Sequence, residues 1–96
     1  MIFHITSFYD WERQSKEKFF APEGFADEGF IHCCEQDQLQ GVLQRHYAGR
    51  FNLLLLHIDE SKLESELKYE TSVQGEMFPH VFGPINKTAI SQVGRI

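Results

Sequence analysis

The sequence is short of cysteine, proline and positive charge, and it has no long apolar run. Its 96 residues include two cysteines and three prolines, and 9 basic residues stand against 14 acidic ones, for a net charge of −5. Binding to a nucleic-acid backbone or an anionic membrane surface needs surplus Lys and Arg, so this composition argues against both partners. The longest apolar run, Leu53 to Leu56, is far too short to span a bilayer.

The two cysteines, Cys33 and Cys34, are adjacent. Neighbouring Cα atoms lie about 3.8 Å apart, which is shorter than disulfide geometry favours, and no second pair exists. We expect both thiols to be reduced and Cys33 to be the more buried, and we predict a cytoplasmic protein. The first residues lack the positive and apolar regions of a signal peptide, so none is expected.

The remaining composition is that of an ordinary globular protein. Hydrophobic residues make up 42% of the chain and charged residues 24%, with nine phenylalanines and five histidines. A chain of this length holds one hydrophobic core, so we predict a single domain over residues 1–96, and we expect a monomer.

The alternation of apolar and polar residues predicts a mixed α/β fold of the α+β type with a curled sheet. Strands are expected over residues 2–6, 29–33, 52–58, 68–71 and 87–93. Helices are expected over residues 11–19, with Asp10 as the N-cap, and over residues 39–47, while residues 20–28 are expected to form a loop. In the first strand we expect Phe3 and Ile5 to face the core. Residues 78–84 contain two prolines, which donate no ladder hydrogen bond, so we expect no central strand there.

Three histidines have similar sequence surroundings. His4, His32 and His80 each lie in a strand or loop between apolar neighbours, so that the imidazole points away from the packed side. We predict that the three converge on one concavity. The alternative is that each is a half-buried histidine bonded to backbone. His46 and His57 are expected in the core or at its edge.

The sequence gives weaker support to other sites. His32 and Cys34 share a strand face, and thiolate with imidazole suits zinc, but the spacing matches no common zinc motif, so no metal ligand is predicted. A Cys–His nucleophile has no support beyond composition. Glu70, beside Tyr69, has the chemistry of a general acid or base, or of an acceptor for a ribose hydroxyl. Its alternative is a surface acid paired with a neighbour such as Lys68.

Several segments together carry a family resemblance. Glu28-Gly29-Phe30-Ile31-His32 and Phe78-Pro79-His80 are the most specific, and Phe3-His4-Ile5-Thr6 and Tyr69-Glu70 occur in the same order. Over residues 2–89 the chain resembles the bacterial family called domain of unknown function 952. Cys34 stands where that family usually has Ser, and Phe82 stands where it usually has Tyr.

The resemblance implies a fold like that of the ADP-ribosyltransferases and RNA 2′-phosphotransferases, with two small curled β-sheets forming a cleft and two flanking helices. Those enzymes hold the nicotinamide-side ribose with a first-strand His or Arg, and His4 falls at that place. His32 falls where a second strand supplies Tyr, Ser or His. Many of those enzymes also have a Glu on a late strand. The last predicted strand of this chain, residues 87–93, has no Glu, and Glu70 lies earlier in the chain than the resemblance would place that residue.

Four functions follow as hypotheses. The first is an ADP-ribosyltransferase-like enzyme or former enzyme that acts on NAD or a related nucleotide. The others are a non-catalytic nucleotide or phosphate-binding module, a zinc-dependent hydrolase, and a protein–protein adaptor whose aromatic residues line an exposed patch. For the ADP-ribosyltransferase-like enzyme, the predicted catalytic residues are His4, His32, His80 and Glu70. The predicted nucleotide-binding residues are His4, Thr6, His32, Tyr69 and Phe82.

Overall fold

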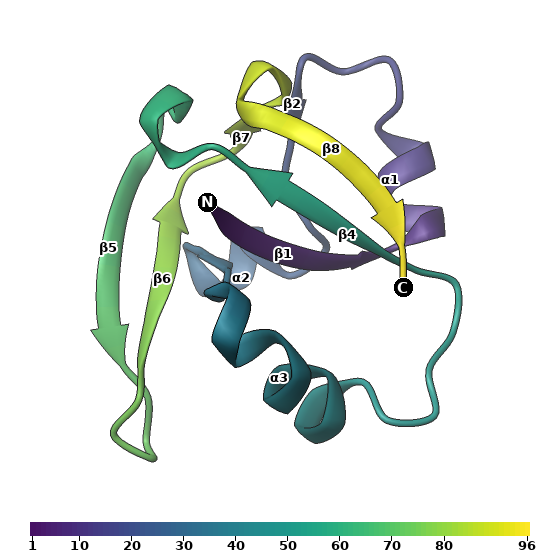
Figure 1. Ribbon diagram of the computed structural model, residues 1–96. Coiled ribbons are helices and arrows are strands. Elements are labelled where there is room, and N and C mark those ends of the chain that lie inside the picture. Colours follow the sequence, from purple (N-terminus) through teal and green to yellow (C-terminus); the bar gives the residue numbers. More distant parts are fainter.

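The computed structural model describes residues 1–96 and arranges the strands in three antiparallel sheets (Figure 1). The first sheet has the order β1-β4-β8, formed by Ile2–Ser7, Leu53–Ile58 and Ile90–Arg95. The second has the order β3-β6-β5, formed by Ile31–His32, Met77–Phe82 and Glu66–Thr71. The third pairs β2 (Phe19–Phe20) with β7 (Ile85–Asn86). The fold is therefore of the mixed α+β kind that the sequence predicts, with a small third sheet that it does not.

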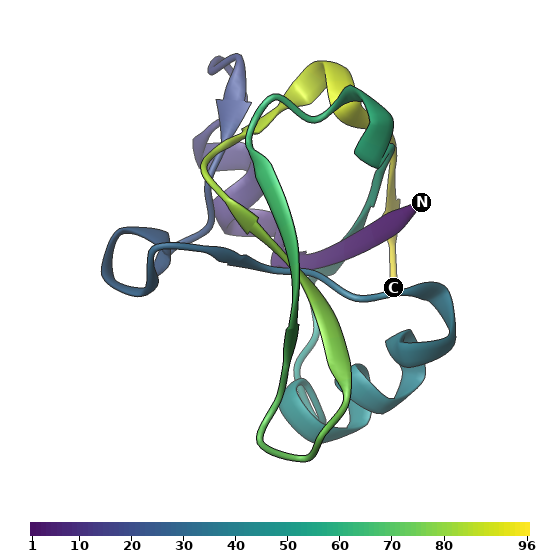
Figure 2. The ribbon, with the colours of Figure 1, turned by 90° about the vertical axis from the view of Figure 1, so that its left-hand side faces the viewer.

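Short helices connect the strands. The α-helices are α1 (Phe8–Arg13), α2 (Phe25–Glu28) and α3 (Leu39–His46), and single 3₁₀ turns cover Gln36–Gln38, Glu60–Lys62 and Lys87–Ala89. Figures 1 and 2 both place α3 at the lower end of the molecule, next to the tip of the β5–β6 hairpin. Residues 20–28, expected as a loop, contain the end of β2 and the whole of α2. No helix is long and apolar enough to cross a membrane.

The first helix differs from its predicted bounds. It begins at Phe8 because the Ser7 hydroxyl accepts a hydrogen bond from the backbone N–H of Asp10, at 3.0 Å, which makes Ser7 the N-cap. Asp10 thus lies inside the first turn of the helix. The helix ends at Arg13, well before Phe19, which pairs with Asn86 as a strand.

The prediction that residues 78–84 form no central strand is wrong. Strand β6 lies between β3 and β5 and contains Pro79. The carbonyl of Pro79 accepts from the N–H of Cys33, so its nitrogen faces β3 rather than the long ladder with β5. Because β3 is only two residues long, the missing donor costs little there.

The hydrophobic core draws on all three sheets. Its buried cluster consists of Ile2, Phe20, Ile31, Cys33, Leu56, Ile58, Val81, Ile85 and Ala89. Strand β1 contributes Ile2 to this cluster, so the face that it shares with His4 packs on the core. Phe3 and Ile5, which we expected on the core face, are buried on the opposite side of β1, outside this cluster.

Residues 33 and 34 join the second sheet to the first. The N–H of Cys33 bonds to Pro79 of β6, whereas the N–H and carbonyl of Cys34 both bond to Phe3 of β1, at 2.8 Å. Both cysteines are free and buried. Their exposed fractions, 5% and 3%, do not show the difference in burial that we expected. The peptide between them therefore crosses from one sheet to the other through the interior.

Candidate functional site

The candidate site is a cavity of about 750 Å³ that runs around the free edge of β1. The edge of β1 that faces away from β4 pairs with Cys34 at Phe3, and beyond that residue it has no neighbouring strand. The cavity opens at this edge and is lined by residues of β1, α1, β3, α3 and the β5–β6 hairpin, together with the loops before and after α2. All three predicted histidines, His4, His32 and His80, line this one cavity.

His4 is the most deeply placed of the three. Its side chain is buried, and its Nδ1 lies 2.6 Å from the backbone carbonyl oxygen of His32. A carbonyl can only accept, so Nδ1 carries the proton and Nε2 is left with a lone pair. Nε2 is buried without a partner. Burial lowers the pKa of His4 to about 4, against the opposing effect of the His32 hydrogen bond, so the ring is neutral at physiological pH.

His32 and His80 form a cross-strand pair between β3 and β6, with ring centroids 5.3 Å apart. Each imidazole has a carboxylate partner. His32 Nε2 lies 3.0 Å from Glu28, and His80 Nδ1 lies 2.7 Å from Glu70. Phe30 stacks on His80 at a centroid distance of 4.3 Å. The carboxylates therefore orient both rings, and in neutral imidazoles they leave the second nitrogen of each as an acceptor.

Of the other predicted site residues, only Thr6 lines the cavity, and it is buried. Tyr69, Glu70 and Phe82 do not line it. Glu70 reaches the site only through His80, and Phe82 packs against Phe30 at 5.5 Å.

Tyr69 cannot serve a ligand in this cavity from where it lies. It is on the opposite face of β5 from Glu70, and its hydroxyl donates to Glu35 at 2.9 Å. Burial and this hydrogen bond raise the pKa of Tyr69 to about 12. His46, expected in the core, is instead exposed and lines the cavity. His57 is half-buried with its ring edge-on to Phe3, as expected for the edge of the core.

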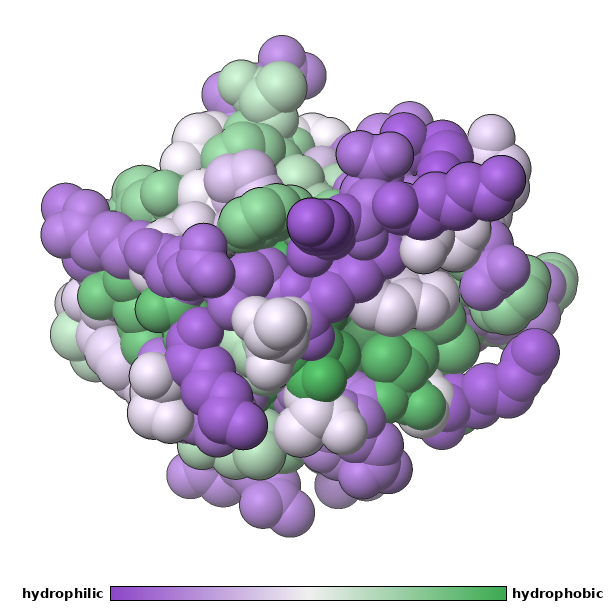
Figure 3. Space-filling view, turned by 90° about the horizontal axis from the view of Figure 1, so that it is seen from above, coloured by the Kyte–Doolittle hydropathy of each residue, from purple (hydrophilic) through white to green (hydrophobic).

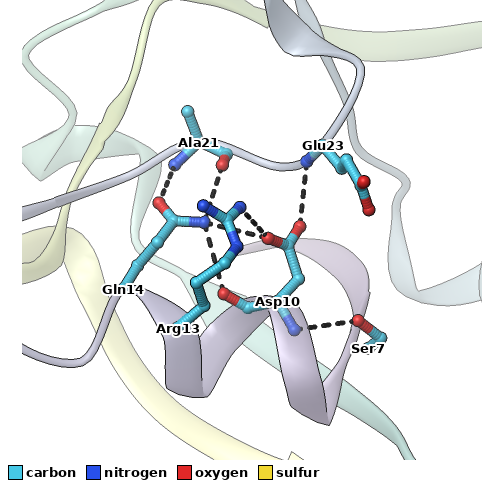
Figure 4. Close-up of polar contacts among 6 residues, drawn as sticks. All are labelled: Ser7, Asp10, Arg13, Gln14, Ala21 and Glu23. Atoms are coloured by element: carbon cyan, nitrogen blue, oxygen red, sulfur yellow. Dashed lines mark hydrogen bonds and ion pairs between the residues drawn. The ribbon is translucent and has the colours of Figure 1, made fainter.

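Asp10 is a residue whose part in the site the sequence did not reveal (Figure 4). Its buried carboxylate lines the cavity and accepts hydrogen bonds from Arg13, from Gln14 at 3.1 Å and from the N–H of Glu23 at 2.9 Å. Gln14 in turn exchanges two hydrogen bonds with the backbone of Ala21. Asp10 therefore fixes the loop before α2 against α1 and shapes that wall of the cavity.

Two arginines, Arg45 and Arg50, also line the cavity without having been predicted. Arg45 lies in the last turn of α3 and Arg50 in the loop after it. Nothing in their immediate sequence distinguishes them from solvated surface cations. Only the packing of α3 beside the hairpin places them at the site.

The zinc hypothesis lacks a ligand set in this structure. No group of three or more His, Cys, Asp or Glu side chains is arranged to hold a metal ion. Although His32 and Cys34 were expected to share a strand face, Cys34 has left β3 and bridges to β1. The imidazoles of the site are instead engaged by carboxylates and a backbone carbonyl.

Comparison with known proteins places the chain in a family. Solved structures of protein CC0527 from Caulobacter crescentus are similar to it, with 27% identity and a TM-score of 0.88 for the crystal structure, which covers 98% of this chain and 83% of that one. The solution NMR structure of the same protein gives 27% identity and a TM-score of 0.84 over 99% and 83% of the two chains. No curated protein matches the chain. The model of the family described as "Protein of unknown function (DUF952)" matches residues 5–93, and the chain belongs to this family.

Proposed function

We propose that the protein binds a nucleotide, NAD or a close relative, in the cavity at the free edge of β1. The proposal is carried by His4, a residue of the lining whose Nε2 is buried without a partner. A buried polar atom without a partner costs free energy, and native proteins keep few of them. A ligand hydroxyl that donates to this lone pair would remove that cost.

The size and chemistry of the cavity suit such a ligand. Small-molecule sites span about 300–1,000 Å³, and the cavity of about 750 Å³ falls within that range. Phe30, Phe78 and Tyr47 offer aromatic surface, while His32 and His80 offer polar atoms on rings that their carboxylate partners hold in place. Aromatic surface with a few oriented polar groups is the composition that binds a base and a sugar.

The resemblance to the ADP-ribosyltransferases supports the choice of nucleotide. In that resemblance His4 takes the place of the first-strand residue that holds the nicotinamide-side ribose. A neutral imidazole with its proton on Nδ1 is suited to accept from a ribose hydroxyl through Nε2. The ADP-ribosylation-like fold, with its cleft between two sheets, is part of this proposal.

A catalytic version of the proposal rests on the Glu70–His80 pair. An imidazole oriented by a carboxylate at 2.7 Å is a common acid–base arrangement. Glu70 is then a positioning residue that acts through His80, since it does not line the cavity. In this version water attacks C1′ of the nicotinamide-side ribose, nicotinamide leaves with the electron pair of the broken bond, and His80 takes the proton from the water, so that the products are nicotinamide and ADP-ribose. The cationic sugar of the transition state lies among the histidines. Without turnover, the same contacts describe a binding module.

Calorimetric titration and thermal unfolding with NAD, ADP-ribose and adenosine test the proposal. His4→Phe keeps a buried ring of similar shape but removes both ring nitrogens, so it loses Nε2 together with the Nδ1 hydrogen bond to His32. His57→Phe is the matched control, because His57 is half-buried in the same sheet and outside the cavity lining. We expect NAD or ADP-ribose to raise the Tm of the wild type and of His57→Phe. The Tm of His4→Phe should be the same with and without these compounds.

Two further readings complete this experiment. Release of nicotinamide from NAD, followed by chromatography, distinguishes an enzyme from a binding module. If none of the three compounds binds the wild type at millimolar concentration, the proposal is wrong. It is also wrong if His4→Phe binds as tightly as the wild type.

A further inference from the structure

We infer that Arg45 and Arg50 form an anion subsite on the α3 wall of the cavity, which takes the phosphate or diphosphate group of the ligand. This inference rests on the proposed function and specifies its ligand as phosphorylated. The chain carries a net charge of −5, which by itself repels anions. The α3 wall of the cavity, with its two arginines, is therefore positively charged in a protein that is negative overall.

Neither arginine has its hydrogen-bond donors taken up by a carboxylate. Arg45 forms an ion pair with Glu76 at 3.8 Å, which is beyond hydrogen-bond distance. Arg50 makes no ion pair, and its guanidinium lies over the ring of Tyr47 at 5.1 Å from the centroid. Both therefore keep N–H donors free for a planar, bidentate contact with phosphate oxygens.

Gly41 provides the room that Arg45 occupies. Glycine is a poor helix residue, yet it stands inside α3, one turn before Arg45. A Cβ atom at Gly41 would lie 2.9 Å from Nη1 of Arg45. The guanidinium can lie across the helix only because that Cβ is missing.

The hairpin holds the same wall in place. The amide of Gln38, just before α3, donates to the carbonyl of Met77 at 2.7 Å and to the carboxylate of Glu76 at 3.2 Å. Gln38 thus bonds one carboxylate oxygen of Glu76, and the other oxygen makes the long ion pair with Arg45 at 3.8 Å. The wall is anchored without using the donors of Arg45.

The remaining walls disfavour an anion. His4 is a neutral acceptor there, and Asp10, Glu23 and Glu28 also line the cavity. An anionic group near these carboxylates would be repelled. The polarity of the cavity therefore orients the ligand, with its hydroxyl groups toward His4 and its phosphates toward α3.

Titration of the full chain with inorganic diphosphate, ADP-ribose and adenosine tests the subsite, with binding followed by NMR and calorimetry at low and high salt. We expect Arg45→Ala and Arg50→Ala each to weaken diphosphate and ADP-ribose binding about tenfold, and to leave adenosine binding unchanged. Gly41→Ala should weaken diphosphate binding too, with no loss of thermal stability, because it displaces only the end of a flexible side chain. Arg95→Ala is the control for lost positive charge, since Arg95 lies outside the cavity lining.

The outcomes separate this inference from the proposed function. Diphosphate binding that depends on both arginines, without binding of any nucleotide, supports the subsite and overturns the proposed function. ADP-ribose binding that is equal in the wild type, Arg45→Ala and Arg50→Ala overturns the subsite and leaves the proposed function standing. If neither diphosphate nor a nucleotide binds, both are wrong.

Discussion

His4 of β1 donates its Nδ1 proton to the backbone carbonyl of His32 in β3, at 2.6 Å. This one contact links the first sheet to the second beside the crossover at Cys33 and Cys34. It also sets the tautomer, which leaves Nε2 of His4 with the lone pair that the proposed ligand would engage. The same hydrogen bond therefore ties the two sheets together and determines what the site can accept.

The buried His4 predicts a specific pH dependence of stability. Its pKa is about 4 in the folded chain and 6.5 ordinarily, so the unfolded chain takes up the proton first as the pH falls. The contribution of His4 is complete above about pH 6.5 and is lost as the pH drops toward 4, by up to about 3 kcal/mol. Urea unfolding at pH 7.5 and pH 4.5 measures it. His4→Phe should lose less stability over this interval than the wild type does, and an equal loss would contradict the account.

Asp10→Ala should destabilise the fold. The substitution leaves the N–H of Glu23 and the amide of Gln14 without their carboxylate acceptor, which costs on the order of 1–3 kcal/mol for groups that stay buried. Asp10→Asn keeps one acceptor oxygen and should cost less. Asp37→Ala, an exposed acid near α3, is the control and should change the free energy of unfolding by under about 0.5 kcal/mol. If urea melts give the same free energy of unfolding for Asp10→Ala and Asp37→Ala, the polar contacts of Asp10 in Figure 4 do not stabilise the fold.

Neither cysteine should react readily in the native protein. Burial raises the pKa of Cys34 to about 11 and also raises that of Cys33, so very little thiolate forms at neutral pH. We expect slow labelling by a thiol reagent in buffer and two rapid equivalents in denaturant. Rapid native labelling of either residue would show that the crossover between the sheets is open.

The two outer histidines should contribute unequally to stability. The side chain of His32 is 61% exposed and that of His80 is 14% exposed and stacked on Phe30. We expect His32→Ala to cost under about 0.5 kcal/mol and His80→Ala about 1 kcal/mol. Leu56→Ala, fully buried in β4, is the reference and should cost about 2–5 kcal/mol.

Equal destabilisation by all three substitutions in urea melts would mean that the histidines are structural. In that case the alternative considered from the sequence, half-buried histidines that serve the fold, would be the better interpretation.

Features that depend on local periodicity could be predicted from the sequence. Strand β4 lies between β1 and β8 and is largely buried, and its residues 53–58 are aliphatic apart from His57. Such a run can be identified as a central strand from the sequence alone. Strand alternation shows which face of its own strand each histidine takes, but the shared cavity depends on the pairing of β3 with β6 and on the contact of His4 with His32. The α3 helix follows in the same way from its apolar positions.

Other features depend on contacts between distant segments. Whether Pro79 is tolerated in a central strand depends on which neighbour its nitrogen faces, and the sequence does not state that. Ser7 caps α1 in place of the predicted Asp10, because both residue types can accept from the first turn and the path of the backbone decides which of them does. Arg45 and Arg50 became part of the site only through the packing of α3 beside the hairpin.

The most direct test of the account is the ¹⁵N NMR signal of the His4 ring. In the free protein at pH 7 we expect a neutral ring with its proton on Nδ1 and an unprotonated Nε2. Saturating NAD should shift the Nε2 resonance toward that of a hydrogen-bonded acceptor while the Nδ1 proton stays in place. An Nε2 signal that does not move in the presence of saturating NAD, or a free ring protonated on Nε2 instead, would contradict the proposed role of His4.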